Sequence, residues 1–339
     1  MKCAVVILNW NGLQHLQHYL PRVVATTHDA DIVVADNGSN DGSIEWLRSE
    51  MSAVRLVLLD KNYGFAGGYN RALAQLPEYD TFVLLNSDIE PAEGWLAPLL
   101  EQLERNADVA VVVPKILDDK CRNKFEYAGA AGGFIDILGY PFCRGRILST
   151  VEEDKGQYND IAPVLWATGA CLLIRSKDYW EVGGLDGRFF AHQEEIDLCW
   201  RLRSRGRGVV CVPQSVAYHL GGGTLPQGNP RKTFLNFRNN LLLLYKNLPE
   251  ERFAKVMRLR FWLDALASVQ FLLTMQWGSF LAVWKARRAF YEMKEDFRKN
   301  REENQRKTTL SPVPEQSTFS LLWQYYIKGK KTYSKLCDQ

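Results

Sequence analysis

The chain has few cysteines, and none of them falls into a recognisable motif. Its 339 residues include seven Cys, but no CxxC pair and no Cys and His spacing typical of a zinc site. An odd number of scattered cysteines argues against a disulfide framework and fits reduced thiols. We therefore expect a cytoplasmic protein.

The sequence also lacks a familiar nucleotide-binding loop and a leader-like segment. Neither the GxGxxG fingerprint of dinucleotide-binding proteins nor the GxxxxGK[ST] phosphate-binding loop occurs in it. The apolar run of residues 3–8 is too short for the core of a signal peptide, and Asn9 interrupts it. We interpret this run as the first strand of the fold.

The net charge is small, +3, but it is unevenly distributed. Residues 1–250 carry 25 Lys and Arg against 30 Asp and Glu, whereas residues 251–339 carry 17 against 9. The basic, aromatic-rich C-terminal third suggests an anionic surface as a partner. The acidic first part and the lack of a known nucleic-acid-binding motif argue against nucleic acid. We expect a catalytic domain over residues 1–245 and a helical extension over residues 246–339.

Strand-like and helix-like segments alternate through the first half of the chain. This order predicts an α/β protein with a mainly parallel, doubly wound sheet and helices on both faces. Residues 118–165 are irregular and rich in Gly and charge, and we expect hairpins and loops there. The expected strands cover residues 4–8, 31–35, 54–59, 81–85, 109–113, 170–174 and 208–212, and the expected helices cover residues 13–25, 43–49, 67–76, 94–105, 176–182 and 196–204.

One long segment of the C-terminal third, residues 261–284, is mostly apolar and aromatic. Asp264 and two glutamines interrupt it, and basic residues flank it on both sides. Three interpretations compete: an interfacial amphipathic element, a buried helical hairpin and a membrane span. We rank them in that order because Trp residues and basic flanks are typical of a membrane surface. The charged residues 294–314 are expected to form an exposed helix end and a linker.

Two of the expected strands run directly into carboxylates. Asp36 follows the strand at residues 31–35, and Asp88 follows the strand at residues 81–85 after Asn86 and Ser87. Acids at the carboxyl ends of strands lie where α/β sheets bind ligands, and a hard cation with phosphates is a common reason for them. Either acid alone also fits a simple cap of the next turn.

Three further acids, Glu194, Glu195 and Asp197, stand near the start of an expected helix. The helix dipole favours acids in a first turn, which is a purely structural explanation. The neighbouring Phe189 and Phe190 supply an apolar wall, and such a wall raises the pKa of a carboxylate enough to accept a proton from an alcohol. The cluster therefore fits either a structural or a catalytic role.

Two glycine-rich stretches lie beside further candidate residues. His219 precedes the glycines at 221–223, and imidazole with a carboxylate can hold Mn²⁺ or Mg²⁺, although a lone His is more often structural. The loop at residues 62–71 leads into a helix, whose N-terminus favours an anion. Each of these signals is weak alone.

Taken in order, these segments resemble the family-2 glycosyltransferases with the GT-A fold, especially the rhamnosyltransferase-like branch. The resemblance covers roughly residues 3–245. Each motif alone is loose, but their order and spacing together are specific. The motifs are Ile7-Leu8-Asn9-Trp10-Asn11-Gly12, Asp36-Asn37-Gly38-Ser39-Asn40-Asp41-Gly42-Ser43, residues 62–71, Leu84-Leu85-Asn86-Ser87-Asp88, Thr168-Gly169-Ala170-Cys171-Leu172-Leu173-Ile174-Arg175, Gly183-Gly184-Leu185-Asp186, Glu194-Glu195-Ile196-Asp197-Leu198, His219 and Phe237-Arg238-Asn239.

The resemblance implies a site for a divalent metal, Mg²⁺ or Mn²⁺, and a nucleotide. Asn86 stands at the first acid position of the DxD-type motif, so metal binding would depend mainly on Asp88, with His219 completing the site. The nucleotide would lie against Asn9, Trp10, Asn11, Asp36, Gly64, Asn70 and Asn86.

The resemblance also implies a catalytic base. Glu195 stands at the second position of the family's acidic pair, where an Asp is usual, and its extra methylene moves the carboxylate. Asp197 is the second candidate for the base, and Glu194 is the other acid of the pair.

These roles imply an inverting glycosyltransferase. It would move a sugar from a nucleotide-diphospho-sugar to a hydroxyl of a glycan or lipid-linked acceptor, in cell-surface polysaccharide synthesis. The C-terminal extension would bring it to the inner membrane surface as a peripheral protein.

Two alternatives remain at this point. A nucleotidyltransferase that forms sugar nucleotides would need a basic phosphate loop after the first strand, whereas residues 9–12 contain no basic residue. A catalytically silent nucleotide-sugar-binding scaffold would not need the acids, which are all present.

Overall fold

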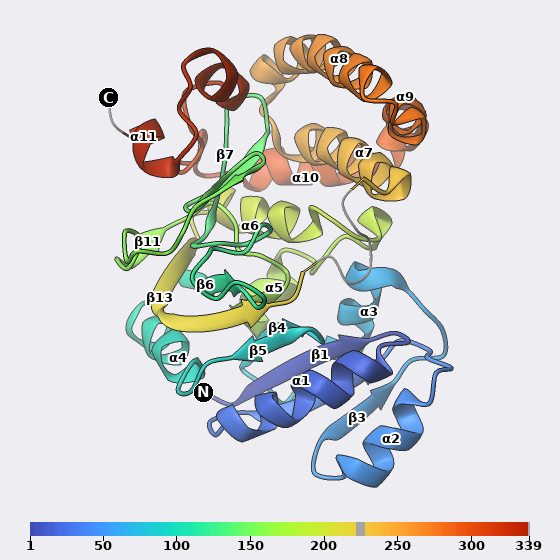
Figure 1. Ribbon diagram of the computed structural model, residues 1–339, viewed down its shortest axis with the longest axis vertical. Coiled ribbons are helices and arrows are strands. Elements are labelled where there is room, and N and C mark those ends of the chain that lie inside the picture. Colours follow the sequence, from blue (N-terminus) through green and yellow to red (C-terminus); the bar gives the residue numbers. More distant parts are fainter. Residues whose placement is uncertain (222–227, 338–339) are drawn as a thin grey trace.

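The protein folds around a central mixed sheet that carries helices on both faces (Figure 1). The computed structural model describes residues 1–221 and 228–337. From one edge of the sheet to the other, the strands are β11 (Ala162–Pro163), β13 (Gly208–His219), β6 (Val109–Asp118), β12 (Cys171–Arg175), β4 (Thr81–Asn86), β1 (Cys3–Asn9), β2 (Asp31–Asp36) and β3 (Arg55–Leu58), and β5 (Ile89–Pro91) pairs with β13.

The expected parallel sheet is present on the N-terminal side. β1 pairs in parallel with β2 and β4, and β2 pairs in parallel with β3. β12 then runs antiparallel between β4 and β6, and β13 returns parallel to β6, so the whole sheet is mixed. The helices of this part are α1 (Leu13–Thr26), α2 (Ser43–Glu50), α3 (Gly64–Leu73), α4 (Leu96–Arg105), α5 (Ser176–Glu181), η1 (Gly187–Phe189) and α6 (Glu194–Ser204).

Alternate residues of the central strands face two separate hydrophobic cores. In β1, Val5 and Ile7 belong to the core that α1 and α4 cover, whereas Ala4 and Val6 belong to the core that α3 and α6 cover. All four side chains are buried, as expected for strands with helices on both faces. This double burial explains the nearly continuous apolar runs in the sequence.

Within the irregular residues 118–165, residues 133–151 form a second, small sheet, which agrees with the expected hairpins. Its strands are packed against the C-terminal tail, where Phe142 and Ile147 bury themselves with Leu321 and Tyr325. Asp136 fixes this contact, because its carboxylate accepts the backbone N–H of Leu321 at 2.7 Å. The strands are β7 (Gly133–Ile135), β8 (Pro141–Cys143), β9 (Arg146–Ile147) and β10 (Thr150–Val151).

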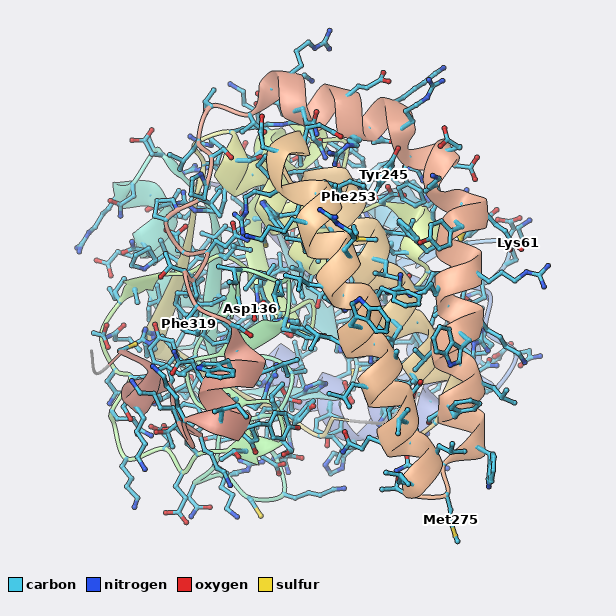
Figure 2. The ribbon with its side chains drawn as sticks, turned by 90° about the horizontal axis from the view of Figure 1, so that it is seen from above. Lys61, Asp136, Tyr245, Phe253, Met275 and Phe319 are labelled. Carbon is cyan, nitrogen blue, oxygen red and sulfur yellow. The ribbon has the colours of Figure 1, made fainter. Side chains whose placement is uncertain are left out.

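The C-terminal part is helical and lies against the part of the chain that contains the central sheet (Figure 1). The apolar residues 261–284 form the outer part of a hairpin of two long helices, which lie side by side in Figure 2. Within the described residues, no helix combines the length and apolarity needed to cross a bilayer. The elements are α7 (Pro230–Asn247), α8 (Glu250–Leu273), α9 (Trp277–Met293), η2 (Lys294–Phe297), α10 (Arg298–Lys307), η3 (Trp323–Ile327) and α11 (Tyr333–Cys337).

Candidate active site

The parallel strands β1, β2 and β4 bring their carboxyl ends to one edge of the sheet. Asn9, Asp36 and Asn86 are the last residues of these strands. The amide of Asn9 donates to Asp36 Oδ2 at 2.9 Å. The polar residues at this edge are therefore neighbours in space, as expected where an α/β sheet binds a ligand.

Both carboxylate oxygens of Asp36 have partners within the protein, and one of them caps the loop that follows. The side chain is buried, and Oδ1 accepts the backbone N–H groups of Gly38 and Ser39 at 3.1 and 2.8 Å. It therefore performs the capping role that its sequence allowed. Trp10 lies beside this loop with half of its surface exposed, and the backbone N–H of Asn11 is held by Ser39.

Asp88 and His219 meet directly, although 130 residues separate them in the chain. Asp88 lies in the turn between β4 and β5, and His219 ends β13. His219 Nε2 lies 3.2 Å from Asp88 Oδ1, and the backbone N–H of Leu220 donates to the carbonyl of Asp88. Both side chains are largely buried. The pairing of β5 with β13 produces this contact.

A second acid, Glu126, lies on the other side of the His219 imidazole. Its Oε1 lies 3.4 Å from His219 Nδ1, and its Oε2 accepts the backbone N–H groups of Ala128 and Gly129. Sequence reasoning missed Glu126, because it stands in the irregular segment at residues 118–165 with no motif around it. No sequence signal was available, since only the fold brings it to His219.

Electrostatic attraction stabilises the trio of Asp88, His219 and Glu126. Burial alone would lower the pKa of His219, but its contacts with Asp88 and Glu126 outweigh burial and raise the pKa to about 10. Burial alone would raise the pKa of Asp88, and the hydrogen bond from His219 instead lowers it below the usual range. The contacts with these two acids thus favour the protonated form of the imidazole.

This trio fits a divalent cation in place of that proton. Asp88 supplies a hard oxygen, His219 supplies Nε2, and Glu126 fixes the ring from behind, as outer carboxylates do for metal-binding histidines. Among the described residues, no group of three or more His, Cys, Asp or Glu side chains converges as a complete metal cage. A cation here would therefore need further ligands from a bound substrate, such as phosphate oxygens.

Glu195 lies on the first turn of α6, next to the strand that holds Asn86. A Cβ on Gly169 would lie 3.6 Å from Glu195 Cβ, and the carbonyl of the next residue, Ala170, accepts the backbone N–H of Asn86 at 2.8 Å. The side chain is half-buried, and its Oε2 has no hydrogen-bond partner among the described residues. Burial raises the pKa of Glu195 to about 7.

The two other acids of this cluster have different surroundings. Glu194 is buried, and burial together with the neighbouring Glu195 raises its pKa well above the usual value. Asp197 points into an ion cluster: Oδ2 accepts from Arg201 and Lys246 at 2.9 and 2.8 Å, and Oδ1 accepts from Asn247. Burial alone would raise the pKa of Asp197, but these cations lower it.

The loop before Glu195 has an unusual backbone, which one side chain holds in place. Phe190, His192 and Gln193 have φ values of 67°, 71° and 70°. The amide nitrogen of Asn239 on α7 donates to the carbonyls of Phe189, Ala191 and His192 at 3.1, 2.8 and 2.7 Å. Arg238 also donates to the carbonyl of Phe189. The Arg-Asn pair of the sequence therefore clamps this loop.

The glycine-rich start of α3 lies against the same loop. Gly64 has a φ of +72°, and a Cβ there would come within 2.7 Å of the Phe190 ring. The backbone N–H of Phe65 donates to the carbonyl of Phe190 at 3.0 Å. Asn70, expected beside the nucleotide, instead binds Leu185 through both its amide atoms, and Tyr179 through its oxygen. Its contacts connect α3 to the segment before η1.

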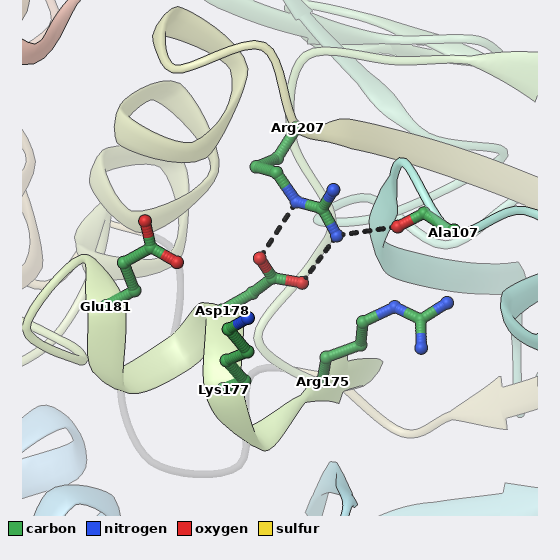
Figure 3. Close-up of a pocket in the computed structure, with 6 residues that line it drawn as sticks. All are labelled: Ala107, Arg175, Lys177, Asp178, Glu181 and Arg207. Carbon is green, nitrogen blue, oxygen red and sulfur yellow. Dashed lines mark hydrogen bonds and ion pairs between the residues drawn. The ribbon is translucent and has the colours of Figure 1, made fainter.

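A separate pocket lies at the other end of the strands, away from the carboxyl ends of β1, β2 and β4 (Figure 3). Arg175 ends β12 there, opposite the first residue of β4, Thr81. The two arginines in it are already engaged: Asp178 binds Arg207 through two 2.8 Å hydrogen bonds, and Arg175 donates to backbone carbonyls. This pocket is therefore part of the scaffold rather than of the site at the strand ends.

Known proteins resemble this chain in both sequence and fold. An "N-acetylglucosaminyl-diphospho-decaprenol L-rhamnosyltransferase" of Mycobacterium tuberculosis is 29% identical over 233 residues, which cover 63% of this chain and 75% of the relative. The "Rhamnosyltransferase WbbL" of Escherichia coli is 28% identical over 163 residues, which cover 46% of this chain and 61% of the relative.

The fold extends the likeness over nearly the whole chain. The solved structure of "Mannosyltransferase PcManGT from Pyrobaculum calidifontis in complex with GDP-Man and Mn2+" has a TM-score of 0.51 at 13% identity, over 90% of this chain and 87% of that one. The predicted GT-A fold and the rhamnosyltransferase-like branch are confirmed. The model of the family "Glycosyl transferase family 2" matches residues 4–183, slightly more than half of the sequence, and the chain belongs to that family.

Proposed function

We propose that this glycosyltransferase inverts the anomeric centre of its donor sugar and uses Glu195 as the general base. The observation that carries the proposal is the position of Glu195. The side chain is half-buried, its buried Oε2 has no hydrogen-bond partner among the described residues, and its pKa of about 7 suits proton transfer near neutral pH. Asp197 is a weaker candidate, because both its oxygens are bound to cations and an amide.

The proposed reaction is a single displacement. Glu195 takes the proton from an acceptor hydroxyl as that oxygen attacks the anomeric carbon of a nucleotide-diphospho-sugar, and the bond to the diphosphate breaks on the opposite face. The transition state has oxocarbenium character, as in glycoside hydrolysis. Asp88 and His219 would hold a divalent cation, which offsets the charge that develops on the leaving diphosphate.

The donor would lie across the carboxyl ends of β1, β2 and β4. Trp10 and Asn11 are exposed and would contact the base and ribose, whereas Asn9 is fully buried and would act through its hydrogen bond to Asp36. Asn86 would lie beside the donor at the end of β4. Glu194 is too deeply buried to serve as the base, and burial together with the neighbouring Glu195 keeps its own pKa well above the usual value. In this proposal Asp36 and Asn70 act indirectly, by holding the two loops that border the donor.

We propose a lipid-linked acceptor at the cytoplasmic face of a membrane. The name of the mycobacterial relative refers to a decaprenol-linked sugar, which supports an acceptor joined to a lipid through a diphosphate. The basic residues 251–339 would hold the enzyme on the inner membrane surface as a peripheral protein. Cell-surface polysaccharide synthesis is the corresponding process.

A binding screen followed by a kinetic comparison tests the proposal. Thermal shift against a panel of nucleotide-diphospho-sugars with Mn²⁺ identifies the donor. Glu195→Gln should then bind that donor normally and turn over about 10²–10⁴-fold more slowly, because general-base help has this magnitude. Glu101→Gln on α4, which removes an exposed carboxylate, serves as the matched control. Normal turnover by Glu195→Gln would exclude this base.

The cation site needs a separate test. Asp88→Asn should weaken donor binding in the presence of Mn²⁺ and should make the remaining activity less sensitive to a chelator. Activity that no chelator affects would contradict the role of Asp88 and His219. Release of pyrophosphate from a nucleoside triphosphate and a sugar phosphate would instead support a nucleotidyltransferase.

A further inference from the structure

The turn between α8 and α9 presents large apolar side chains to solvent. Leu273, Met275 and Trp277 are 78%, 82% and 62% exposed, although residues of this kind are usually buried. Figure 2 shows Met275 at the outer end of the hairpin, away from the rest of the molecule. Leu266 and Trp262 extend the exposed apolar surface along α8. We call Leu273, Met275 and Trp277 the hairpin tip.

The outer half of the hairpin carries no charge in its sequence. No Asp, Glu, Lys or Arg occurs from residue 265 to residue 284. At the inner end of this uncharged stretch, the buried carboxylate of Asp264 binds Arg287 at 2.8 Å and Arg260 at 3.3 Å. This ion cluster joins the two helices, so the hairpin holds its tip as a fixed projection.

Basic side chains stand behind the tip at a defined height. Lys285 on α9 is exposed and lies eight residues after Trp277, which corresponds to about 12 Å along a helix axis. An amphipathic element buries its apolar part about 5–10 Å below the headgroups. With the tip at that depth, Lys285 would lie at the level of lipid phosphates. Arg288 is also exposed, one turn further on.

The tip lies close to the loop that carries the proposed base. A Cβ on Gly278 would come within 2.5 Å of Pro230 Cγ, so α9 touches the first residue of α7. The hydroxyls of Ser279 and Thr233 are 3.3 Å apart. Arg231, which follows Pro230 on α7, places its guanidinium 5.5 Å from the centre of the Phe190 ring, in the loop before Glu195. A surface that receives the tip therefore also lies near the loop before Glu195, where the acceptor hydroxyl would meet the proposed base.

We propose that the hairpin tip inserts into the headgroup region of a bilayer that contains anionic phospholipids, with the active site facing that bilayer. The partner is a lipid surface because the tip is apolar and uncharged while exposed cations stand behind it. This inference rests on the proposed function in one respect: a lipid-linked acceptor gives the orientation its purpose. The insertion itself is a separate property of the chain.

Flotation of the full-length protein with vesicles tests the insertion. Vesicles of phosphatidylcholine with phosphatidylglycerol should carry the wild type, and vesicles of phosphatidylcholine alone should carry less. The double variant Leu273→Ser/Trp277→Ser should partition at least about tenfold more weakly, because two large apolar side chains no longer enter the bilayer. The matched control, Ile161→Ser/Trp180→Ser, replaces side chains that are 49% and 41% exposed elsewhere, and it should float like the wild type.

Each outcome decides the inference independently of catalysis. A tip variant that floats like the wild type, or a wild type that never floats, overturns it. A wild type that forms a dimer in light scattering, and a tip variant that is monomeric, overturns it as well, because the tip would then be a contact between copies. Donor binding and turnover do not enter this experiment. A tip variant that loses flotation but keeps its donor affinity supports the insertion even if Glu195 proves not to be the base.

Discussion

At the scale of single residues, the three acids of one cluster illustrate how surroundings assign chemistry. Glu194, Glu195 and Asp197 lie within one turn of α6. Burial without a cation raises the pKa of the two glutamates, whereas Arg201 and Lys246 lower the pKa of Asp197. Only Glu195 combines a raised pKa with a partly exposed side chain. This combination is what a base for an alcohol requires.

The pH dependence of the reaction should report Glu195. With a pKa of about 7, the carboxylate is mostly protonated at pH 6, and a protonated base cannot accept a proton from the acceptor. We expect kcat/KM for the acceptor to fall about tenfold per pH unit below pH 7. The measurement is a pH–rate profile of the wild type and of Glu195→Gln. A profile that is flat from pH 5 to pH 8, or an acidic limb that Glu195→Gln retains, would contradict the assignment.

Removing the charge of Asp197 should damage stability instead. Asp197→Asn leaves Lys246 and Arg201 buried with one partner fewer, and breaking a buried ion pair in this way costs about 3–5 kcal/mol. Urea denaturation measures this loss. Glu195→Gln is the contrasting variant: folding raises the pKa of Glu195, so its charge opposes folding above pH 7, and the variant should be as stable as the wild type or more stable. Equal stability of Asp197→Asn and the wild type would refute the cluster's role.

The sequence reveals candidate residues better than it reveals their partners. Asp88 and His219 stand in recognisable motifs, and the structure brings them to 3.2 Å. Glu126 could not be found, because its neighbours in the chain show no periodicity and its partner is 93 positions away. Asp36 was a candidate for either ligand binding or capping, and the structure shows that one of its oxygens caps its own loop. Contacts across the fold decide each of these roles.

At the scale of elements, the loop between η1 and α6 stores strain that α7 maintains. A non-glycine residue with a positive φ costs about 1–3 kcal/mol, and this loop contains three. Asn239 offsets part of this cost with its hydrogen bonds to three carbonyls. The loop leads directly into Glu195, and we therefore propose that Asn239 is a positioning residue for the proposed base rather than a catalytic residue.

Asn239→Ala should therefore lower kcat more than it changes donor affinity. Without the amide, the loop relaxes and the carboxylate of Glu195 moves, whereas the strand ends beside the donor keep their shape. Steady-state kinetics and donor titration measure the two effects. Asn106→Ala, at the exposed end of α4, is the control. A parallel loss of kcat and donor affinity would indicate general damage, and an unchanged kcat would remove the positioning role.

Element boundaries follow from the sequence where one pattern dominates. The first five expected strands begin within one residue of their observed starts, because short apolar runs bounded by polar residues leave little choice. β13 extends to His219 although the expected strand ended at residue 212, since a register shift between Val212 and Val216 passes Pro213 and lets the strand continue. The charged residues 294–314 were expected to be exposed, but Arg301 and Asn304 of α10 are buried. Charge alone could not reveal this docking, because three of the contacts are made to backbone carbonyls of α7 and the residue after it, beside the ion pair of Arg301 with Glu250.

At the scale of the whole molecule, the C-terminal helices support the catalytic half. The ring of Phe297 in η2 is fully buried and packs edge-on against Phe189, at the start of the strained loop. Arg188 beside it binds the carbonyl of Asp296 and the side chain of Asn300. The division of the chain at residues 245 and 246 remains a prediction. The packing indicates that the two parts depend on each other.

Removal of residues 251–339 should therefore destabilise the catalytic half as well as detach it from lipid. Truncation would expose the face of α7 that packs on α9, and it would remove Phe297 from the loop before Glu195. Phe297→Ala isolates the second effect: loss of a buried Phe costs about 3–5 kcal/mol, and kcat should fall as the loop loosens. Thermal unfolding and activity should both decline in this variant, yet flotation should persist, because the hairpin tip is intact. The reverse pattern, normal stability and kcat in Phe297→Ala, would mean that the extension only anchors the enzyme and that the catalytic half is complete without it.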